Sequence, residues 1–207
     1  MPVVVVGGHT RNIGKTTLVT QLLSATAELG WTAIKITQYG HNICSANGEA
    51  CDCAAGDHAV AVSEERRSDS GTDTGRMLAA GAERVLWIRT QQGALKDAMP
   101  RLRRELAGAP YALVESNSVL RFLRPDIYLS VLHPRIADFK PSSLRYLDRA
   151  HALFVPEGEC LDTVAWPGVS AAMLRQKPVY SLNEDRLPDE AVKWFRAKLA
   201  ASTHPAK

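Results

Sequence analysis

The stretch Val3-Val4-Val5-Val6-Gly7-Gly8-His9-Thr10-Arg11-Asn12-Ile13-Gly14-Lys15-Thr16-Thr17-Leu18 decides the fold of this chain. It joins a run of β-branched residues, typical of a buried strand, to a glycine-rich turn. The apolar residues that follow share one helical face at steps of three or four, and they are Leu18, Leu22, Ala25 and Leu29. We therefore expect a strand, a tight turn and a helix that ends at Gly30.

The turn has the residues needed to bind phosphate. Glycines allow backbone N–H groups to point inward at phosphate oxygens, and a helix N-terminus adds partial positive charge. Lys15 would contact the β and γ phosphates, and Thr16 would offer its hydroxyl to Mg²⁺. The residues expected to line the nucleotide are Gly8, Thr10, Asn12, Ile13, Gly14, Lys15, Thr16 and Thr17. These features predict a P-loop that binds GTP or ATP with Mg²⁺.

The glycine spacing departs from the usual P-loop by one residue. Five residues separate Gly8 from Gly14, where four are usual, and His9 stands where the first glycine is expected. An incidental turn with a solvated lysine is the alternative interpretation. The preceding strand, the following helix and the intact Gly-Lys-Thr-Thr sequence favour phosphate binding.

A second marker is Glu115, at the end of the predicted buried strand Tyr111–Glu115. Ligands of an open parallel sheet bind outside the carboxyl ends of its strands, so Glu115 would face the same crevice as Lys15. There it could hold Mg²⁺ through a water or activate a nucleophile. A solvated carboxylate at a strand end is the alternative.

Short β-branched runs alternate with helical stretches along the chain. This alternation predicts an α/β fold, a doubly wound and mostly parallel sheet with helices on both faces. The expected strands are Val3–Val6, Thr32–Ile36, Ala59–Val62, Val85–Arg89, Tyr111–Glu115, Ile127–Leu132, Ala152–Val155 and Pro178–Leu182. A closing helix is expected behind Pro188. The segment from Asp138 to Pro141 suits either a helix start or a contact to a base or substrate.

Composition fits one globular domain, residues 1–207. Hydrophobic residues make up 45% of the chain, and the net charge of +3 gives no support to a nucleic-acid or membrane binder. The longest apolar runs are far shorter than the roughly 20 residues that cross a bilayer. The N-terminus has no basic leader, so we expect a cytoplasmic protein.

Residues 38–58 interrupt the alternation with a Cys/His-rich loop. Its soft ligands suit a tetrahedral zinc site and are Cys44, Cys51, Cys53 and His58. His41 is a substitute ligand, Cys160 is a distant fourth thiol, and ligand type alone leaves an iron–sulfur cluster open. Reduced, partly buried cysteines are the alternative. We predict a bound metal, with zinc as the default, because so long a polar loop buries too little surface to order itself.

Three segments carry a resemblance to a known class, namely Gly8-x5-Gly14-Lys15-Thr16, Ala33-Ile34-Lys35-Ile36-Thr37 and Leu113-Val114-Glu115. Together they resemble the P-loop NTPases that include dethiobiotin synthetase and the molybdopterin-guanine dinucleotide biosynthesis protein B family. The longer glycine spacing is similar to that of dethiobiotin synthetase. Residues 73–82 resemble a molybdopterin-family segment in which an Asp and an Arg precede an Ala-Gly-Ala helix end, so this family is the closer likeness.

The resemblance implies roles for individual residues. Lys15 and Thr16 would bind nucleotide and metal, Glu115 would bind Mg²⁺, and Lys35 would lie near the γ phosphate or a bound acid. Lys35 stands among apolar residues at the expected carboxyl end of its strand, which favours a side chain that faces the crevice. Asp73 is a further catalytic candidate that could pair with Arg76 or act in a nucleotide switch.

Three classes of function follow from these residues and from the resemblance. The favoured class is slow, Mg-dependent hydrolysis of GTP or ATP by an adaptor that acts with a partner enzyme in molybdenum cofactor biosynthesis, as a homodimer. An ATP-dependent ligase similar to dethiobiotin synthetase and a metal-binding regulator without turnover are the alternatives. The cysteine loop favours the first and third classes. No Asn-Lys-x-Asp element is present, so the preferred base stays open.

Overall fold

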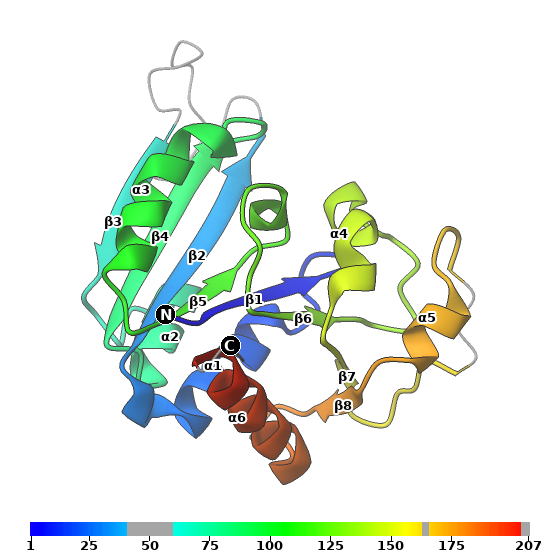
Figure 1. Ribbon diagram of the computed structural model, residues 1–207. Helices are drawn as coiled ribbons and strands as arrows, with labels where there is room; N and C mark the ends of the chain where they lie inside the picture. The colour runs from blue at the N-terminus through cyan, green and yellow to red at the C-terminus, as the bar shows by residue number, and fades with distance from the viewer. Residues whose placement is uncertain (41–59, 163–165, 204–207) are drawn as a thin grey trace.

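The computed structural model describes residues 1–40, 60–162 and 166–203. Its core is one twisted sheet of eight strands (Figure 1). The strands are β1 (Val3–Gly8), β2 (Trp31–Tyr39), β3 (Val60–Glu65), β4 (Arg84–Gln91), β5 (Tyr111–Glu115), β6 (Ile127–Val131), β7 (Ala152–Pro156) and β8 (Val179–Leu182). Their order is β3-β4-β2-β5-β1-β6-β7-β8, and β3 pairs antiparallel with β4 while the remaining pairs are parallel. The prediction of a mostly parallel sheet is confirmed.

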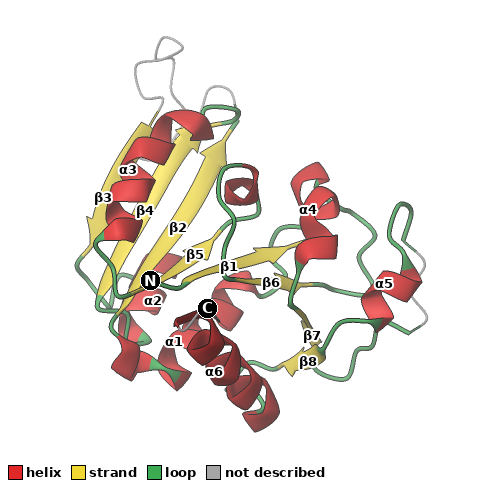
Figure 2. Cartoon of the chain, viewed as in Figure 1, coloured by secondary structure: helices red, strands yellow, loops and turns green. Residues whose placement is uncertain are grey.

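Helices cover both faces of the sheet (Figure 2). Side chains of α1 (Lys15–Ala25), α2 (Asp73–Ala79) and α6 (Asp189–Thr203) join one hydrophobic cluster. Side chains of α3 (Leu95–Ala107), α4 (Pro141–Tyr146) and α5 (Ala171–Arg175) join the other. Short 3₁₀ turns lie at Ala27–Leu29, Ser118–Arg121 and Leu147–Arg149. The chain is therefore doubly wound, as its alternating pattern predicts.

The helices of the described ranges include none with both the length and the apolar character to cross a membrane. Pro141 occupies the first turn of α4, and α6 begins directly after Pro188, so the two proline-marked helix starts are confirmed.

The prediction that the first helix reaches Gly30 is wrong by one turn. The α-helix ends at Ala25, because Thr26 leaves the helical conformation with φ −143°. The Thr26 hydroxyl donates to the carbonyl oxygen of Leu22 at 2.6 Å, and the Trp31 indole N–H donates to the Thr26 carbonyl at 3.0 Å. A single 3₁₀ turn then leads to Gly30, which has the expected left-handed conformation.

Strand register brings the predicted site residues together. β5 lies between β1 and β2, with Glu115 opposite Val6 on one side and opposite Lys35 on the other. Lys35 lies inside β2, which continues to Tyr39, so the prediction that it ends its strand is wrong. Because β5 stops at Glu115, Lys35 still lies level with a strand end.

Gly7 gives the first prediction. A Cβ added to Gly7 would lie 1.9 Å from the Asn117 Oδ1 atom and 3.0 Å from the Tyr128 ring. We expect Gly7→Ala to lower the free energy of unfolding by about 1–3 kcal/mol, measured by urea denaturation, because neither neighbour can move without disturbing β1.

Gly108→Ala is the matched control. Gly108 has φ −86°, and a Cβ there would lie no closer than 3.8 Å to the Arg104 carbonyl oxygen, so its effect should stay within about 0.5 kcal/mol. Equal stability of the two variants would show that Asn117 is not fixed against β1.

Candidate functional site

The loop between β1 and α1 has the arrangement of a P-loop. Gly14 is the N-cap of α1 with φ 94°, and Asn12 also has a positive φ of 54°. Asn tolerates this left-handed conformation better than most residues, whereas glycine adopts it without strain. A Cβ at Gly14 would also lie 2.9 Å from the Leu182 side chain. The extra residue in the glycine spacing is therefore accommodated with the helix start intact.

Lys15 reaches back across this loop. Its Nζ donates to the Thr10 carbonyl oxygen at 2.7 Å. Burial lowers the pKa of Lys15 to about 8, the Glu115 carboxylate opposes this shift, and the Lys140 and Lys35 ammonium groups add to it. The mouth of the loop thus holds a partly desolvated cation that an anion would stabilise.

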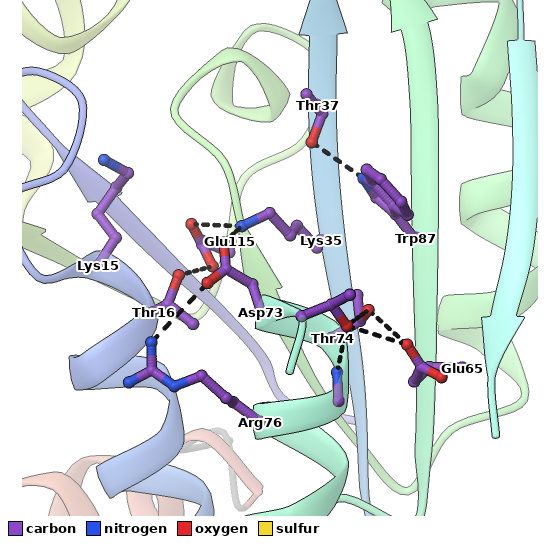
Figure 3. Close-up of polar contacts among 12 residues, drawn as sticks. Lys15, Thr16, Lys35, Thr37, Glu65, Asp73, Thr74, Arg76, Trp87 and Glu115 are labelled. Atoms are coloured by element: carbon purple, nitrogen blue, oxygen red, sulfur yellow. Dashed lines mark hydrogen bonds and ion pairs between the residues drawn. The ribbon is translucent and has the colours of Figure 1, made fainter. Parts of the chain in front are cut away.

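Thr16 and Glu115, the two residues predicted to bind Mg²⁺, are in direct contact (Figure 3). The Thr16 hydroxyl donates to Glu115 Oε2 at 3.0 Å, and Glu115 is 6% exposed. Hydroxyl and carboxylate oxygens are hard ligands of the kind that Mg²⁺ prefers, usually with several waters completing the octahedron. The residues present therefore fit the predicted metal.

Lys35 lies between two carboxylates. Its Nζ is 3.6 Å from Glu115 Oε1 and also pairs with Asp73, the first residue of α2. Arg76 lies 3.8 Å from the second Asp73 oxygen, so Asp73 makes both the local helical pair and a contact to the site. Ion pairs thus join three of the predicted catalytic residues, Lys35, Asp73 and Glu115. Lys15 lies close enough for the Glu115 and Asp73 carboxylates to raise its pKa, but Figure 3 shows no polar contact between Lys15 and either of them.

The start of α2 is held by a cluster of hydroxyls around Glu65. Thr72 and Thr74 donate to Glu65 Oε2 at 3.1 and 2.9 Å. Thr72 also caps α2 by accepting from the Gly75 N–H at 3.0 Å. These contacts fix the position of Asp73 relative to β3 and hence relative to Lys35.

Asn117 is a site residue for which the sequence predicts no role. Its Oδ1 accepts from the Gly8 N–H at 3.0 Å, and its Nδ2 donates to the Gly8 carbonyl at 2.5 Å. The amide therefore joins the end of β5 to the end of β1. The sequence feature that could have indicated its role is its position, two residues after Glu115 at the end of a predicted strand.

His9 has a structural role in the place of the missing glycine. Its side chain is fully buried, with the ring 4.7 Å from that of Phe139 and 5.7 Å from that of Trp166. The His133 N–H donates to Nδ1 at 3.4 Å, so the neutral ring carries its proton on Nε2 and donates to the Ile136 carbonyl at 3.1 Å. His9 thus ties the loop between β1 and α1 to the segment after β6.

Two further contacts join the same segments. The Thr10 hydroxyl donates to Asp138 Oδ2 at 3.0 Å, and the Lys140 N–H donates to the His9 carbonyl at 2.8 Å. Burial lowers the pKa of the Lys140 ammonium, and the positive charge of Arg11 lowers it further. The segment from Asp138 to Pro141 therefore both begins a helix and contacts the phosphate loop.

The predicted zinc ligands lie outside the described residues, and they are Cys44, Cys51, Cys53, His58 and the substitute His41. Cys160 is exposed and forms no disulfide with another described residue. Among residues 1–40, 60–162 and 166–203, no three His, Cys, Asp or Glu side chains are grouped to hold a metal ion.

The chain is loosely similar to several solved structures, three of which are described here. LpxK from Aquifex aeolicus in complex with ATP aligns with TM-score 0.47 and 17% identity over 87% of this chain and 53% of that chain. HypB from Helicobacter pylori in complex with nickel gives TM-score 0.45 and 11% identity over 96% and 86%. The MinC:MinD cell division complex of Aquifex aeolicus gives TM-score 0.43 and 12% identity over 96% and 86%.

The chain spans about half the length of the LpxK chain. No protein-family model and no curated protein matches its sequence. Because the structural likenesses are loose, we infer function from the geometry of this chain's own residues.

The buried His9 ring predicts acid sensitivity. Burial lowers its pKa from the ordinary value of 6.5, so as pH falls below about 6.5 the unfolded chain takes up a proton that the folded chain resists. Stability should fall by up to about 1.4 kcal/mol per pH unit from this group. Urea denaturation at pH 7.5 and 5.5 should show a smaller loss in His9→Gln than in the wild type.

The control is His151→Gln. The pKa of His151 is also lowered by burial, and its Nδ1 accepts from the Tyr128 N–H. This control should keep the His9 contribution. An identical acid loss in His9→Gln and the wild type would contradict a neutral His9.

Proposed function

We propose that the chain binds a nucleoside triphosphate with Mg²⁺ and slowly hydrolyses it. The observation that supports this most strongly is the contact between the Thr16 hydroxyl and the Glu115 carboxylate, directly after the Gly14 turn and beside the partly buried Lys15. A hydroxyl, a carboxylate and a cation around a loop that opens a helix form the combination that binds Mg²⁺ and phosphate.

Each residue then has a distinct task. Backbone N–H groups from Asn12 to Thr16 bind phosphate oxygens, and Lys15 exchanges its bond to the Thr10 carbonyl for the β and γ phosphates. Thr16 and Glu115 hold Mg²⁺, which neutralises charge on the phosphates when bound. Lys35 is placed to contact the γ phosphate, since it lies 3.6 Å from Glu115. Water is the acceptor in the basal reaction.

The finer proposal is an adaptor similar to the molybdopterin-guanine dinucleotide biosynthesis protein B family. It is supported by the ion pair between Lys35 and Asp73, because this pair joins two of the segments that carry the resemblance. Release of Lys35 from Asp73 by a γ phosphate would shift the start of α2, as in switch segments of other nucleotide-binding proteins. A partner enzyme would then sense the nucleotide state. The predicted zinc ligands Cys44, Cys51, Cys53 and His58 lie between Lys35 and Asp73 in the sequence.

Calorimetric titration with Mg-ATP and Mg-GTP tests nucleotide binding. We expect at least one to bind, and Lys15→Ala to weaken it by about tenfold to a hundredfold, because charge-assisted hydrogen bonds to phosphate are lost. Lys96→Ala, at an exposed position of α3, is the matched control and should bind as the wild type does. Metal analysis of the same sample tests zinc.

Equal binding by Lys15→Ala and the wild type, or no binding of either nucleotide, would refute the proposal. A sample without zinc would leave nucleotide binding in place and remove the metal from the adaptor proposal.

The pKa of Lys15 predicts how affinity depends on pH. Free protein loses the Lys15 charge as pH rises through about 8, whereas bound phosphate keeps the ammonium protonated. Nucleotide affinity should therefore fall above pH 8, by up to about tenfold per pH unit. Titrations from pH 7 to 9.5 measure this slope. Lys15→Arg, which stays charged, should show a flatter profile; a steep fall in that variant would assign the titration to another group.

A further inference from the structure

A buried arginine on β4 takes no part in the function proposed above. Arg89 is 9% exposed, and its guanidinium lies 4.4 Å from the centre of the Trp87 ring. Its buried Nε has no hydrogen-bond partner, and within the described residues Arg89 forms no ion pair. Buried arginines are normally paired with an anion or fully hydrogen-bonded. Arg89 is therefore a desolvated cation that lacks a protein counter-ion in the described part of the chain.

Arg89 lies on the same sheet face as the phosphate site. In the register of β2 and β4, Lys35 is opposite Trp87, and Thr37 is opposite Arg89. Alternate residues of a strand share one face, so all four side chains belong to the face that α1 and α2 cover further down the strands. Figure 3 shows Lys35 and Thr37 on β2 and the Trp87 ring beside them on β4, with the hydrogen bond between Thr37 and Trp87 drawn as a dashed line.

The apolar packing on this face stops before Arg89. The hydrophobic cluster includes Ala33 on β2 and Val85 on β4. Beyond them on β2, the same face carries Lys35, Thr37 and Tyr39, all of them half-buried. Burial raises the pKa of Tyr39, and the nearby Arg89 and Lys35 cations oppose that rise. This part of the face is thus polar and positively charged, unlike a packed core.

The Arg89 guanidinium lies against a ring that is itself held in place. The Trp87 indole N–H donates to the Thr37 hydroxyl at 3.0 Å, which fixes the ring against which the guanidinium lies. A guanidinium that lies against an aromatic ring can still bind a carboxylate or phosphate through its N–H groups. Arg89 is two residues beyond Trp87, the partner of Lys35, so it lies about 7 Å farther along the strand direction than Lys35.

We propose that Arg89, with Trp87, Thr37 and Tyr39, forms the subsite of a second substrate, a small molecule with a carboxylate or phosphate group. This inference rests on the proposed nucleotide function. Arg89 binds the anionic group, and Lys35 lies between this subsite and Glu115. A deprotonated oxygen of the second substrate forms the bond to the γ-phosphorus while the bond to the β–γ bridging oxygen breaks. The nucleoside diphosphate leaves with that electron pair.

Calorimetry with succinate, and separately with inorganic phosphate, tests the subsite in protein saturated with Mg²⁺ and ADP. We expect at least one probe to bind and Arg89→Gln to weaken that binding about tenfold or more, since a charged hydrogen-bonding partner is lost. Arg103→Gln, at an exposed position of α3, is the matched control and should bind as the wild type does. Phosphate held at the γ-phosphate position instead would be weakened by Lys15→Ala and not by Arg89→Gln, which would count against the subsite.

Affinity for Mg-ADP shows whether Arg89→Gln is folded, because Arg89 lies outside the nucleotide-binding residues. Arg89→Lys is a second variant that keeps the charge and loses the planar guanidinium, and it should bind the probe with intermediate affinity. Binding of neither probe by the wild type, or equal binding by Arg89→Gln, would overturn the subsite. If the wild type does not bind ADP, the nucleotide function fails, and the succinate titration of nucleotide-free protein then tests the subsite by itself.

Discussion

The site depends on the pairing of β5 between β1 and β2. This register sets Glu115 level with Val6, the residue before the glycine loop, and level with Lys35 on the other side. Because the ligand-binding edge of a parallel sheet lies at its strand ends, the glycine loop, the Glu115 carboxylate and the Lys35 ammonium meet there without any long connecting loop. Asn117 then locks the alignment by bonding both polar backbone atoms of Gly8. A slip of one residue in β5 would turn Glu115 to the opposite face and remove the carboxylate from Thr16.

Much of this arrangement could be predicted from sequence because it follows from local patterns. Three local patterns carry it: the β-branched run Val3–Val6 predicts a strand, the Gly-Lys-Thr-Thr sequence predicts a phosphate-binding helix start, and Glu115 predicts a carboxylate at a strand end. The central strands β1, β5, β6 and β7 could be predicted for the same reason, since parallel strands covered on both faces read as continuous apolar runs. The closing helix was equally marked, by Pro188 and by its apolar face.

What could not be predicted depends on contacts between distant segments. Nothing near His9 in sequence indicates that its ring packs against Phe139 and Trp166 or accepts from the His133 N–H. The polar residues after Ile36 predict that the strand of Lys35 ends there, yet pairing with β4 extends β2 to Tyr39. Arg89 gave no signal at all, since a basic residue near a strand end usually reaches solvent. Tertiary packing decided all three cases.

The antiparallel strand β3 has a consequence for how this chain can vary. Tyr39 pairs with Gln91 and Val60 pairs with Thr90, so the end of β2 and the start of β3 lie on either side of β4 at the same edge of the sheet, about 10 Å apart. Closing a longer chain between fixed points costs little extra free energy. The length of the connection from β2 to β3 can therefore vary at little cost in free energy while the register that aligns Lys35 with Glu115 stays the same.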